Sequence, residues 1–288
     1  MRHLHALIAL ILALAVAPAV RAEPAIWIVR DEDSEMVLFG SIHLLPPGLA
    51  WRPAALDAAL VKADDLWFEL PMGAETQQQA ARLAMRQGTL PPGPGLYERL
   101  PTDSRQRLER LAAEYGLPAN FLDQLKPWFA EVLLVTTMLG RQGADIAHGV
   151  EEQVNITASP EVRRQALETV EEQLGAFDAV PLEEQLASLA YNLQAMEEDP
   201  GAFDRLLAIW MAGDLAALEA EALDPLEAFA PSLYQQLIVD RNTDWLEQLR
   251  TRLAGSGRTV VVVGAGHLVG DVGLPARLRA LGYEVEGP

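Results

Sequence analysis

Hydrophobic residues follow one pattern near the two ends of this chain and another in its middle. Near the ends they form short continuous runs, rich in valine, isoleucine and leucine and bounded by glycine, proline or charged residues. Runs of this kind are typical of buried strands. They predict strands at 25–30, 36–39, 65–70, 258–263 and 283–286, with a weaker one at 162–167. The first two flank a short acidic segment and predict a β-hairpin.

From about residue 75 to 253, apolar residues recur at the spacing of amphipathic helices, with proline or glycine at the breaks. This helical block is predicted to contain helices at 75–87, 102–115, 118–124, 127–139, 181–197, 201–211, 214–222 and 231–253. Further helices are predicted at 51–63 and 274–281. The segment 128–139 is apolar on most of its faces, so it is predicted to be the buried central helix of the block.

Together these elements predict a mixed α/β fold in a single domain over residues 23–288. A small central sheet would be built from strands near both ends of the chain, with the helical block as a large insertion or cap. In open α/β sheets, ligands bind at the carboxyl ends of strands. Since His43, Glu69 and His267 lie at or just past the ends of predicted strands, we expect them to meet at that edge.

The first 22 residues have the pattern of a secretory signal peptide. Arg2 precedes an uncharged apolar core over residues 6–17, and Val20-Arg21-Ala22 offers a cleavage site. This core is shorter than the roughly 20 residues needed to span a bilayer, which makes a retained anchor the less favoured alternative. We therefore expect a periplasmic or secreted protein with no stable membrane anchor. Because cysteine is absent, a lipid-modified cysteine, disulfides and thiol catalysis are excluded.

The charge of the chain limits its partners. Aspartate and glutamate number 41 against 22 lysine and arginine residues, a formal net charge of −19. Nucleic-acid binding depends on cationic neutralisation of phosphates, so no nucleic-acid partner is expected. The acidic residues are scattered over the predicted helices, where most form a solvated face. A peptide or a small molecule is the expected substrate.

One local pattern occurs twice, at opposite ends of the chain. Gly40-Ser41-Ile42-His43 and Gly264-Ala265-Gly266-His267 each follow a predicted strand. Glycine allows the backbone to approach a ligand closely, so Gly40 and Gly264 are predicted to border a cofactor. Imidazole is a metal ligand or a general base near neutral pH. The alternative for each histidine is a hydrogen-bonded structural residue.

Two histidines and a carboxylate at strand ends can form a site for a divalent metal. His43, His267 and Glu69 are the predicted ligands, and manganese, cobalt or zinc would all suit them. Glu69 is either a ligand or the base that takes a proton from metal-bound water. The alternative is that Glu69 is an ordinary surface carboxylate.

Arg241 and Asn242 form a second candidate pair, on the predicted helix 231–253. Asn242 falls within the apolar stripe of that helix, and Arg241 lies at its edge. Polar groups on a core-facing stripe need partners. Their partner is either a pocket carboxylate such as Glu69, a substrate oxygen, or a neighbouring loop. His148, between helices, is predicted to be a cap or a surface residue.

The segments that carry these motifs resemble the TraB/GumN family, which includes the Tiki-like proteins. The matching segments are 38–46, 63–70, 125–128, 167–173, 240–245 and 263–268. The resemblance implies an α/β superfamily shared with erythromycin esterases and haem-binding lipoproteins. It also implies metal-dependent proteolysis, as in the Tiki-like members, with His43, Glu69 and His267 at the metal and catalytic positions and Arg241 and Asn242 as the polar pair. Glu151 departs from the aspartate expected in the family.

The leading hypothesis is an exported metal-dependent hydrolase, a peptidase, in which His43 and His267 hold the ion. Glu69 would be ligand or base, and Arg241 or Asn242 would stabilise the oxyanion. A metal-independent variant would use a histidine directly as base. The alternatives are a non-catalytic periplasmic module that binds haem, a small ligand or a peptide in the same pocket, and a scaffold for a secreted peptide with structural histidines.

Overall fold

Residues 23–288 are described by a computed structural model, so the predicted signal peptide over residues 1–22 lies outside the described residues. The described chain contains a six-stranded mixed sheet in the order β4-β3-β5-β2-β1-β6. The strands are β1 (Ile26–Arg30), β2 (Ser34–Ser41), β3 (Asp65–Phe68), β4 (Arg163–Ala166), β5 (Gly257–Gly264) and β6 (Glu284–Glu286). The mixed α/β fold is thus confirmed. The weak strand of the middle block, β4, forms one edge of the sheet.

The order of the strands brings distant parts of the chain together. β1 and β2 form the predicted antiparallel hairpin, whose turn is fixed by Asp31 accepting hydrogen bonds from the N–H groups of Asp33 and Ser34. β2, β5, β3 and β4 run parallel. Their carboxyl ends therefore lie along one edge, and β5 lies between two strands from the other end of the chain.

Each predicted helix has a counterpart in the structure, within a few residues at most ends. The helices are α2 (Ala54–Lys62), α3 (Ala74–Gln87), α4 (Leu96–Arg99), α5 (Thr102–Tyr115), α6 (Ala119–Leu122), α7 (Pro127–Arg141), α8 (Val150–Thr157), α9 (Val170–Asp178), α10 (Leu182–Glu198), α11 (Ala202–Ala212), α12 (Leu215–Leu218), α13 (Asp224–Phe229), α14 (Pro231–Tyr234), α15 (Arg241–Leu253) and α16 (Leu274–Ala280). Of these, α4, α8, α9 and α13 lie outside the predicted ranges. The predicted helix 231–253 is interrupted by a π-helical turn over Gln235–Asp240, which joins α14 to α15.

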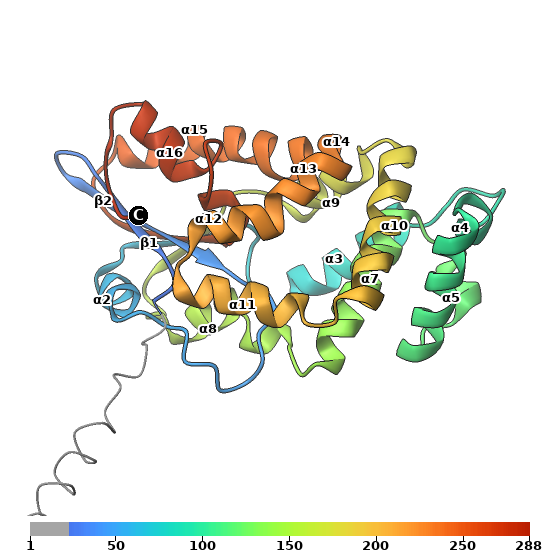
Figure 1. The fold of residues 1–288 in the computed structure, drawn as a ribbon. Helices are drawn as coiled ribbons and strands as arrows, with labels where there is room; N and C mark the ends of the chain where they lie inside the picture. The colour runs from blue at the N-terminus through green and yellow to red at the C-terminus, as the bar shows by residue number, and fades with distance from the viewer. Residues whose placement is uncertain (1–22) are drawn as a thin grey trace, which may run out of the picture.

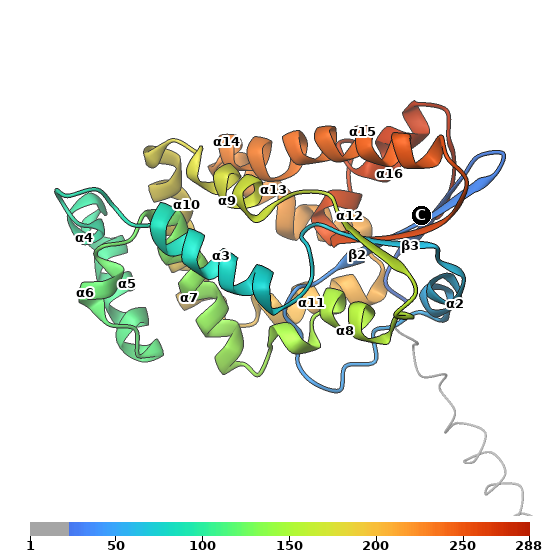
Figure 2. The ribbon, with the colours of Figure 1, turned by 180° about the vertical axis from the view of Figure 1, so that it is seen from behind.

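Helices cover both faces of the sheet. α2, α8 and α11 lie on one face, and α15 and α16 lie on the other (Figures 1 and 2). Along β5, Val260 and Val262 belong to the first core, and Val261 and Val263 belong to the second. Because a strand buried on both faces needs apolar residues at every position, β5 is a continuous valine run rather than an alternating one.

A separate helical lobe extends from one end of the sheet. α4 and α5 lie farthest from the sheet in this lobe (Figure 1). Leucines of α4, α5, α6, α7 and α10 form its own core. Among the helices of residues 23–288, none combines the length and apolar character needed to cross a bilayer.

The predicted central helix, α7, is buried on only part of its circumference. Trp128, Ala130 and Leu134 are buried, with Ala130 and Leu134 in the core of the helical lobe. Val132 is 36% exposed, and together with Val135 and Met138 it lines a large cavity. The prediction of a buried central helix is therefore corrected: one apolar face of α7 packs in the core, and the other borders a cavity.

α7 also carries a partly buried acid, Glu131, that predicts a pH-dependent stability. Glu131 Oε1 accepts hydrogen bonds from Ser188 Oγ at 3.1 Å and Asn192 Nδ2 at 2.8 Å. Burial raises the pKa of Glu131 to about 7 from an ordinary 4.5. The raised pKa contributes stability that is fully present below pH 4.5 and is lost as the pH rises through 7.

We therefore expect Glu131→Gln to match the wild type near pH 4.5 and to exceed its free energy of unfolding by about 1–3 kcal/mol at pH 8. Urea unfolding of both proteins across this range measures the difference, and other titrating groups cancel because they are shared. A difference that does not change with pH would contradict the assignment.

Candidate functional site

Three predicted site residues from distant parts of the chain lie together at the carboxyl ends of the parallel strands. His43 follows β2, Glu69 follows β3, and His267 lies in the short 3₁₀ turn Ala265–Leu268 after β5. A Cβ built on Gly264 would lie 3.6 Å from His43 Nε2, 3.2 Å from Glu69 Oε1 and 3.6 Å from His267 Cδ2. Gly264 therefore keeps open the space among the three side chains.

Glu69 is held by a buried network of charges. Its Oε1 accepts a hydrogen bond from the Gly264 N–H at 2.6 Å. Its Oε2 accepts from Arg241 Nη2 at 2.6 Å and Gln173 Nε2 at 3.1 Å. Arg241 also forms a two-point ion pair with Glu168, through Nε at 2.9 Å and Nη2 at 2.7 Å. The side chains of Arg241, Glu69 and Glu168 are only 12%, 8% and 7% exposed.

Arg241 donates all five of its N–H groups within the protein. Besides the two carboxylates, its Nη1 donates to the Leu237 carbonyl at 3.1 Å and lies 3.0 Å from His267 Nε2. The guanidinium also lies over the Trp245 ring, 4.5 Å from the ring centroid. Since no N–H remains free in this arrangement, Arg241 acts as a positioning residue rather than an oxyanion donor.

Asn242 fixes the orientation of His267. Its Nδ2 donates to the carbonyls of His267, at 3.2 Å, and Val272, at 2.9 Å. Its Oδ1 therefore accepts from His267 Nδ1, at 2.8 Å. This places the imidazole proton on Nδ1 and leaves Nε2 as an acceptor for Arg241. Asn242 is fully buried and, like Arg241, has no N–H left for a ligand.

His43 has different surroundings. Its Nδ1 lies 2.6 Å from Glu151 Oε1, and the same oxygen accepts a hydrogen bond from Ser41 Oγ. More than half of the His43 side chain is exposed, at 58%, and the ring borders a cavity. Gly149 makes this pair possible, because a Cβ there would overlap the His43 carbonyl oxygen. The glycine brings the start of α8, and with it Glu151, against His43.

The pKa values of the two histidines are shifted in opposite directions. The charge of Glu151 raises the pKa of His43, although solvent in the cavity screens part of this effect. Burial lowers the pKa of His267 to about 3, so it is neutral. Burial alone would raise the pKa of Glu69, but the Arg241 charge, together with smaller contributions from the two histidines and the Gly264 N–H, outweighs it and lowers the pKa to about 2. Perturbed pKa values gathered at one cavity are typical of a functional site.

The predicted metal ligands do not fit a metal ion as they are arranged. Arg241 lies against both Glu69 and His267 Nε2 and therefore occupies the position that a cation would take. Within the described part of the chain, no three histidine, aspartate or glutamate side chains are close enough together to hold an ion. Metal binding stays a prediction, and it requires Arg241 to leave its two carboxylates.

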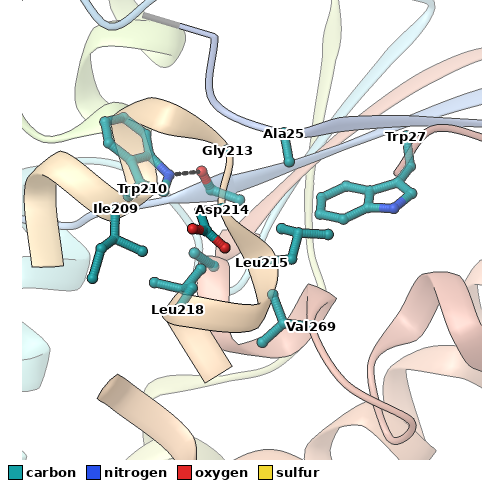
Figure 3. Close-up of a pocket in the computed structure, with 11 residues that line it drawn as sticks. Ala25, Trp27, Ile209, Trp210, Gly213, Asp214, Leu215, Leu218 and Val269 are labelled. Carbon is teal, nitrogen blue, oxygen red and sulfur yellow. Dashed lines mark hydrogen bonds between the residues drawn. The ribbon is translucent and has the colours of Figure 1, made fainter. Parts of the chain in front are cut away.

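Gly40, predicted to border a cofactor, lies away from the cavity. A Cβ there would press against Ala265 at 3.0–3.1 Å, and the Gly40 carbonyl accepts a hydrogen bond from Trp210 Nε1 at 2.9 Å. Trp210, Leu215, Leu218 and Val269 line a small pocket (Figure 3). Its volume is about 10 Å³. A space of this size holds at most one water molecule. Gly40 therefore serves close packing between β2 and the turn after β5.

The structure adds three residues to which the sequence analysis gave no site role: Glu151, Glu168 and Gln173. Glu168 lies two residues past β4, so the strand-end rule that found Glu69 applies to it equally. Gln173 lies in the first turn of α9, whose start is fixed by a capping box of Thr169 and Glu172. His148 pairs with Asp145 at 2.6 Å and lines neither cavity at the site, which agrees with its predicted surface role.

Comparison with known proteins relates this chain to one family. The TraB/PrgY/gumN family model matches residues 25–287. Two proteins named Uncharacterized protein YbaP, from Escherichia coli (strain K12) and Shigella flexneri, are each 27% identical to this chain over 257 residues. The alignments cover 89% of this chain and 92% of each relative. No solved structure matches the chain significantly.

Proposed function

The chain belongs to the TraB/PrgY/gumN family, and from its site we propose that it is an exported hydrolase of peptide or ester bonds with His43 as general base. The proposal is carried by one observation. His43 has its Nδ1 on the Glu151 carboxylate at 2.6 Å, while the ring borders a large cavity at the carboxyl ends of four parallel strands. Export is supported by the signal-like pattern of residues 1–22.

In the proposed reaction, the neutral His43 Nε2 takes a proton from a water molecule as the water oxygen bonds to the substrate carbonyl carbon. The bond between that carbon and the leaving nitrogen or oxygen then breaks, and His43 returns the proton to the leaving atom. Glu151 holds the ring and stabilises the imidazolium that forms between the two steps. Glu69 and Arg241 line the cavity beside His43.

Hydrolysis of a substrate panel tests this proposal. The protein without residues 1–22 would be incubated with fluorogenic peptides and acyl esters, with and without added manganese, cobalt or zinc. Turnover without added metal, and after treatment with a chelator, would support His43 as the base. Turnover only with one of the ions would support the metal-dependent prediction instead. No turnover on any substrate would contradict the hydrolase.

Glu151→Gln is expected to move the pH dependence of kcat/KM to lower pH. A base works when neutral, so the rate rises as the pH rises through the pKa of His43. The Glu151 charge raises that pKa, and its removal lets the pKa fall back towards 6.5. The rising limb of the kcat/KM profile should therefore move to lower pH, while the maximum kcat/KM falls. Glu161→Gln, at an exposed position, should leave the profile unchanged, and an unmoved limb in Glu151→Gln would contradict the dyad.

A second candidate function is binding without turnover. It is favoured because Arg241 and Asn242 donate every side-chain N–H group to protein acceptors, so neither has a donor left for a substrate. Such a site would hold an apolar ligand and do no chemistry on it. Ligand binding that survives His43→Asn, together with no turnover in the panel, would favour this function.

A further inference from the structure

His43 and Glu69 lie at the border between two cavities. The larger has a volume of about 770 Å³ and the smaller about 300 Å³, both within the range of about 300–1,000 Å³ usual for ligand sites. Four residues line both cavities: His43, Leu44, Glu69 and Gln173. A molecule that reaches from one cavity into the other must therefore pass the two site residues.

The larger cavity is suited to a bulky apolar group. Its walls come from both the helical lobe and the helices beside the sheet, and they include Val132, Val135 and Met138 of α7 and Phe203 and Leu206 of α11. An apolar helix face left beside open space costs free energy, which an apolar ligand would recover. The α7 wall of this cavity is apolar, and the polar lining residues lie at the strand ends and on the opposite helical segments, where Asp199 and Glu221 are both paired with Arg205.

The smaller cavity has a different charge. Its lining includes the carboxylates Glu69, Glu151 and Glu152 and no lysine or arginine of the described chain. Glu69 is paired with Arg241, and Glu151 is paired with His43. Glu152 forms no side-chain hydrogen bond or ion pair with any residue from 23 to 288 in this structure, so its charge is available to a ligand. A carboxylate here would be repelled and a protonated amine attracted.

We propose that the site takes a cationic amphiphile, with a long apolar part in the larger cavity and a protonated amine beside Glu152 in the smaller one. One part of this assignment rests on the proposed hydrolase: the bond to be cleaved would lie next to His43, between the apolar part and the amine of the ligand. The binding preference itself does not depend on turnover.

Competition for a neutral apolar dye tests the proposal without any catalytic step. Nile red bound to the protein without residues 1–22 would be displaced by dodecylamine, dodecanol and dodecanoate, each below its micelle concentration. The amine is expected to displace the dye at about tenfold lower concentration than the carboxylate, with the alcohol between them. In Glu152→Gln the ratio between the displacing concentrations of the carboxylate and the amine should shrink to less than about threefold. Equal displacement by the three competitors, or an unchanged ratio in Glu152→Gln, would overturn the amine assignment.

Two further variants test the apolar part. Ala195→Trp places a large ring in the wall of the larger cavity and is expected to weaken Nile red binding by about tenfold or more. Val132→Glu, at a half-exposed position on the same wall, should weaken it as well and serves if Ala195→Trp does not fold. Val61→Trp on α2, where Val61 is 87% exposed, is the matched control. Unchanged dye affinity in folded Ala195→Trp or in Val132→Glu would overturn the apolar assignment.

The outcomes separate this inference from the proposed function. Loss of the amine preference in Glu152→Gln, without any turnover in the substrate panel, would support the ligand class and contradict the hydrolase. Turnover that depends on His43, with equal displacement by all three competitors, would support the hydrolase and contradict the ligand class.

Discussion

Replacing Arg241 by methionine is expected to lower the free energy of unfolding by about 3–5 kcal/mol. The substitution keeps a long side chain but leaves Glu69 and Glu168 without their shared positive charge. Both carboxylates are less than a tenth exposed, so water cannot replace the lost ion pairs. His267 Nε2 and the Leu237 carbonyl lose a donor as well. Urea unfolding at pH 7 measures the effect.

Two control variants separate this network from a general loss of charge. Arg250→Met removes an exposed ion pair with Glu247 on the same helix and should leave the unfolding midpoint unchanged. The triple variant Arg241→Met, Glu69→Gln, Glu168→Gln should recover most of the lost stability, because it removes the unpaired charges together with their partner. An Arg241→Met protein as stable as Arg250→Met would show that the buried network is not what holds the site together.

Replacing His43 by asparagine is expected to lower kcat/KM by about 10²- to 10⁴-fold on any substrate found in the panel. Asparagine is similar in size and polar but cannot accept and return a proton near neutral pH. The stability should change little, since more than half of the His43 side chain is exposed. Kinetics and urea unfolding on the same preparation would show the two effects separately.

His148→Asn is the matched control for this variant. His148, like His43, contacts a carboxylate oxygen through Nδ1 at 2.6 Å and is partly exposed, with Asp145 in place of Glu151. It lines neither of the two cavities, so its replacement should leave the kinetics unchanged. If both variants keep wild-type rates, His43 is not the base.

The location of the site could be predicted from the sequence, because it follows from strands and their ends. The valine run of β5 and the runs of β2 and β3 were recognisable, and residues after parallel strands meet at one edge. Glu168 directly follows the weak strand predicted at 162–167, so the same strand-end rule applies to it. It was missed because β4 has the polar sequence Arg163-Arg164-Gln165-Ala166 of an exposed edge strand, which gives no reason to expect a site residue at its end.

The contacts within the site could not be predicted in the same way. A regular helix over 231–253 places Arg241 at the edge of the apolar stripe, whereas the π-helical turn just before it changes the register so that Arg241 and Asn242 both point to the site. Likewise, the spacing of apolar residues on α7 is the same whether its second face meets core or cavity. Helical periodicity alone does not distinguish the two cases.

The position of β5 also constrains how the chain can fold. β2 and β3 are not paired with each other: β2 pairs with β1, β3 pairs with β4, and β5 joins the two pairs into one sheet. More than 200 residues separate β2 from β5 along the chain, so the centre of the sheet closes only after almost the whole chain has been synthesised. Until then β2 and β3 each have one unpaired edge, which favours aggregation. A chain truncated before Gly257 would therefore lack the strand that joins the two halves of the sheet, and with it the site.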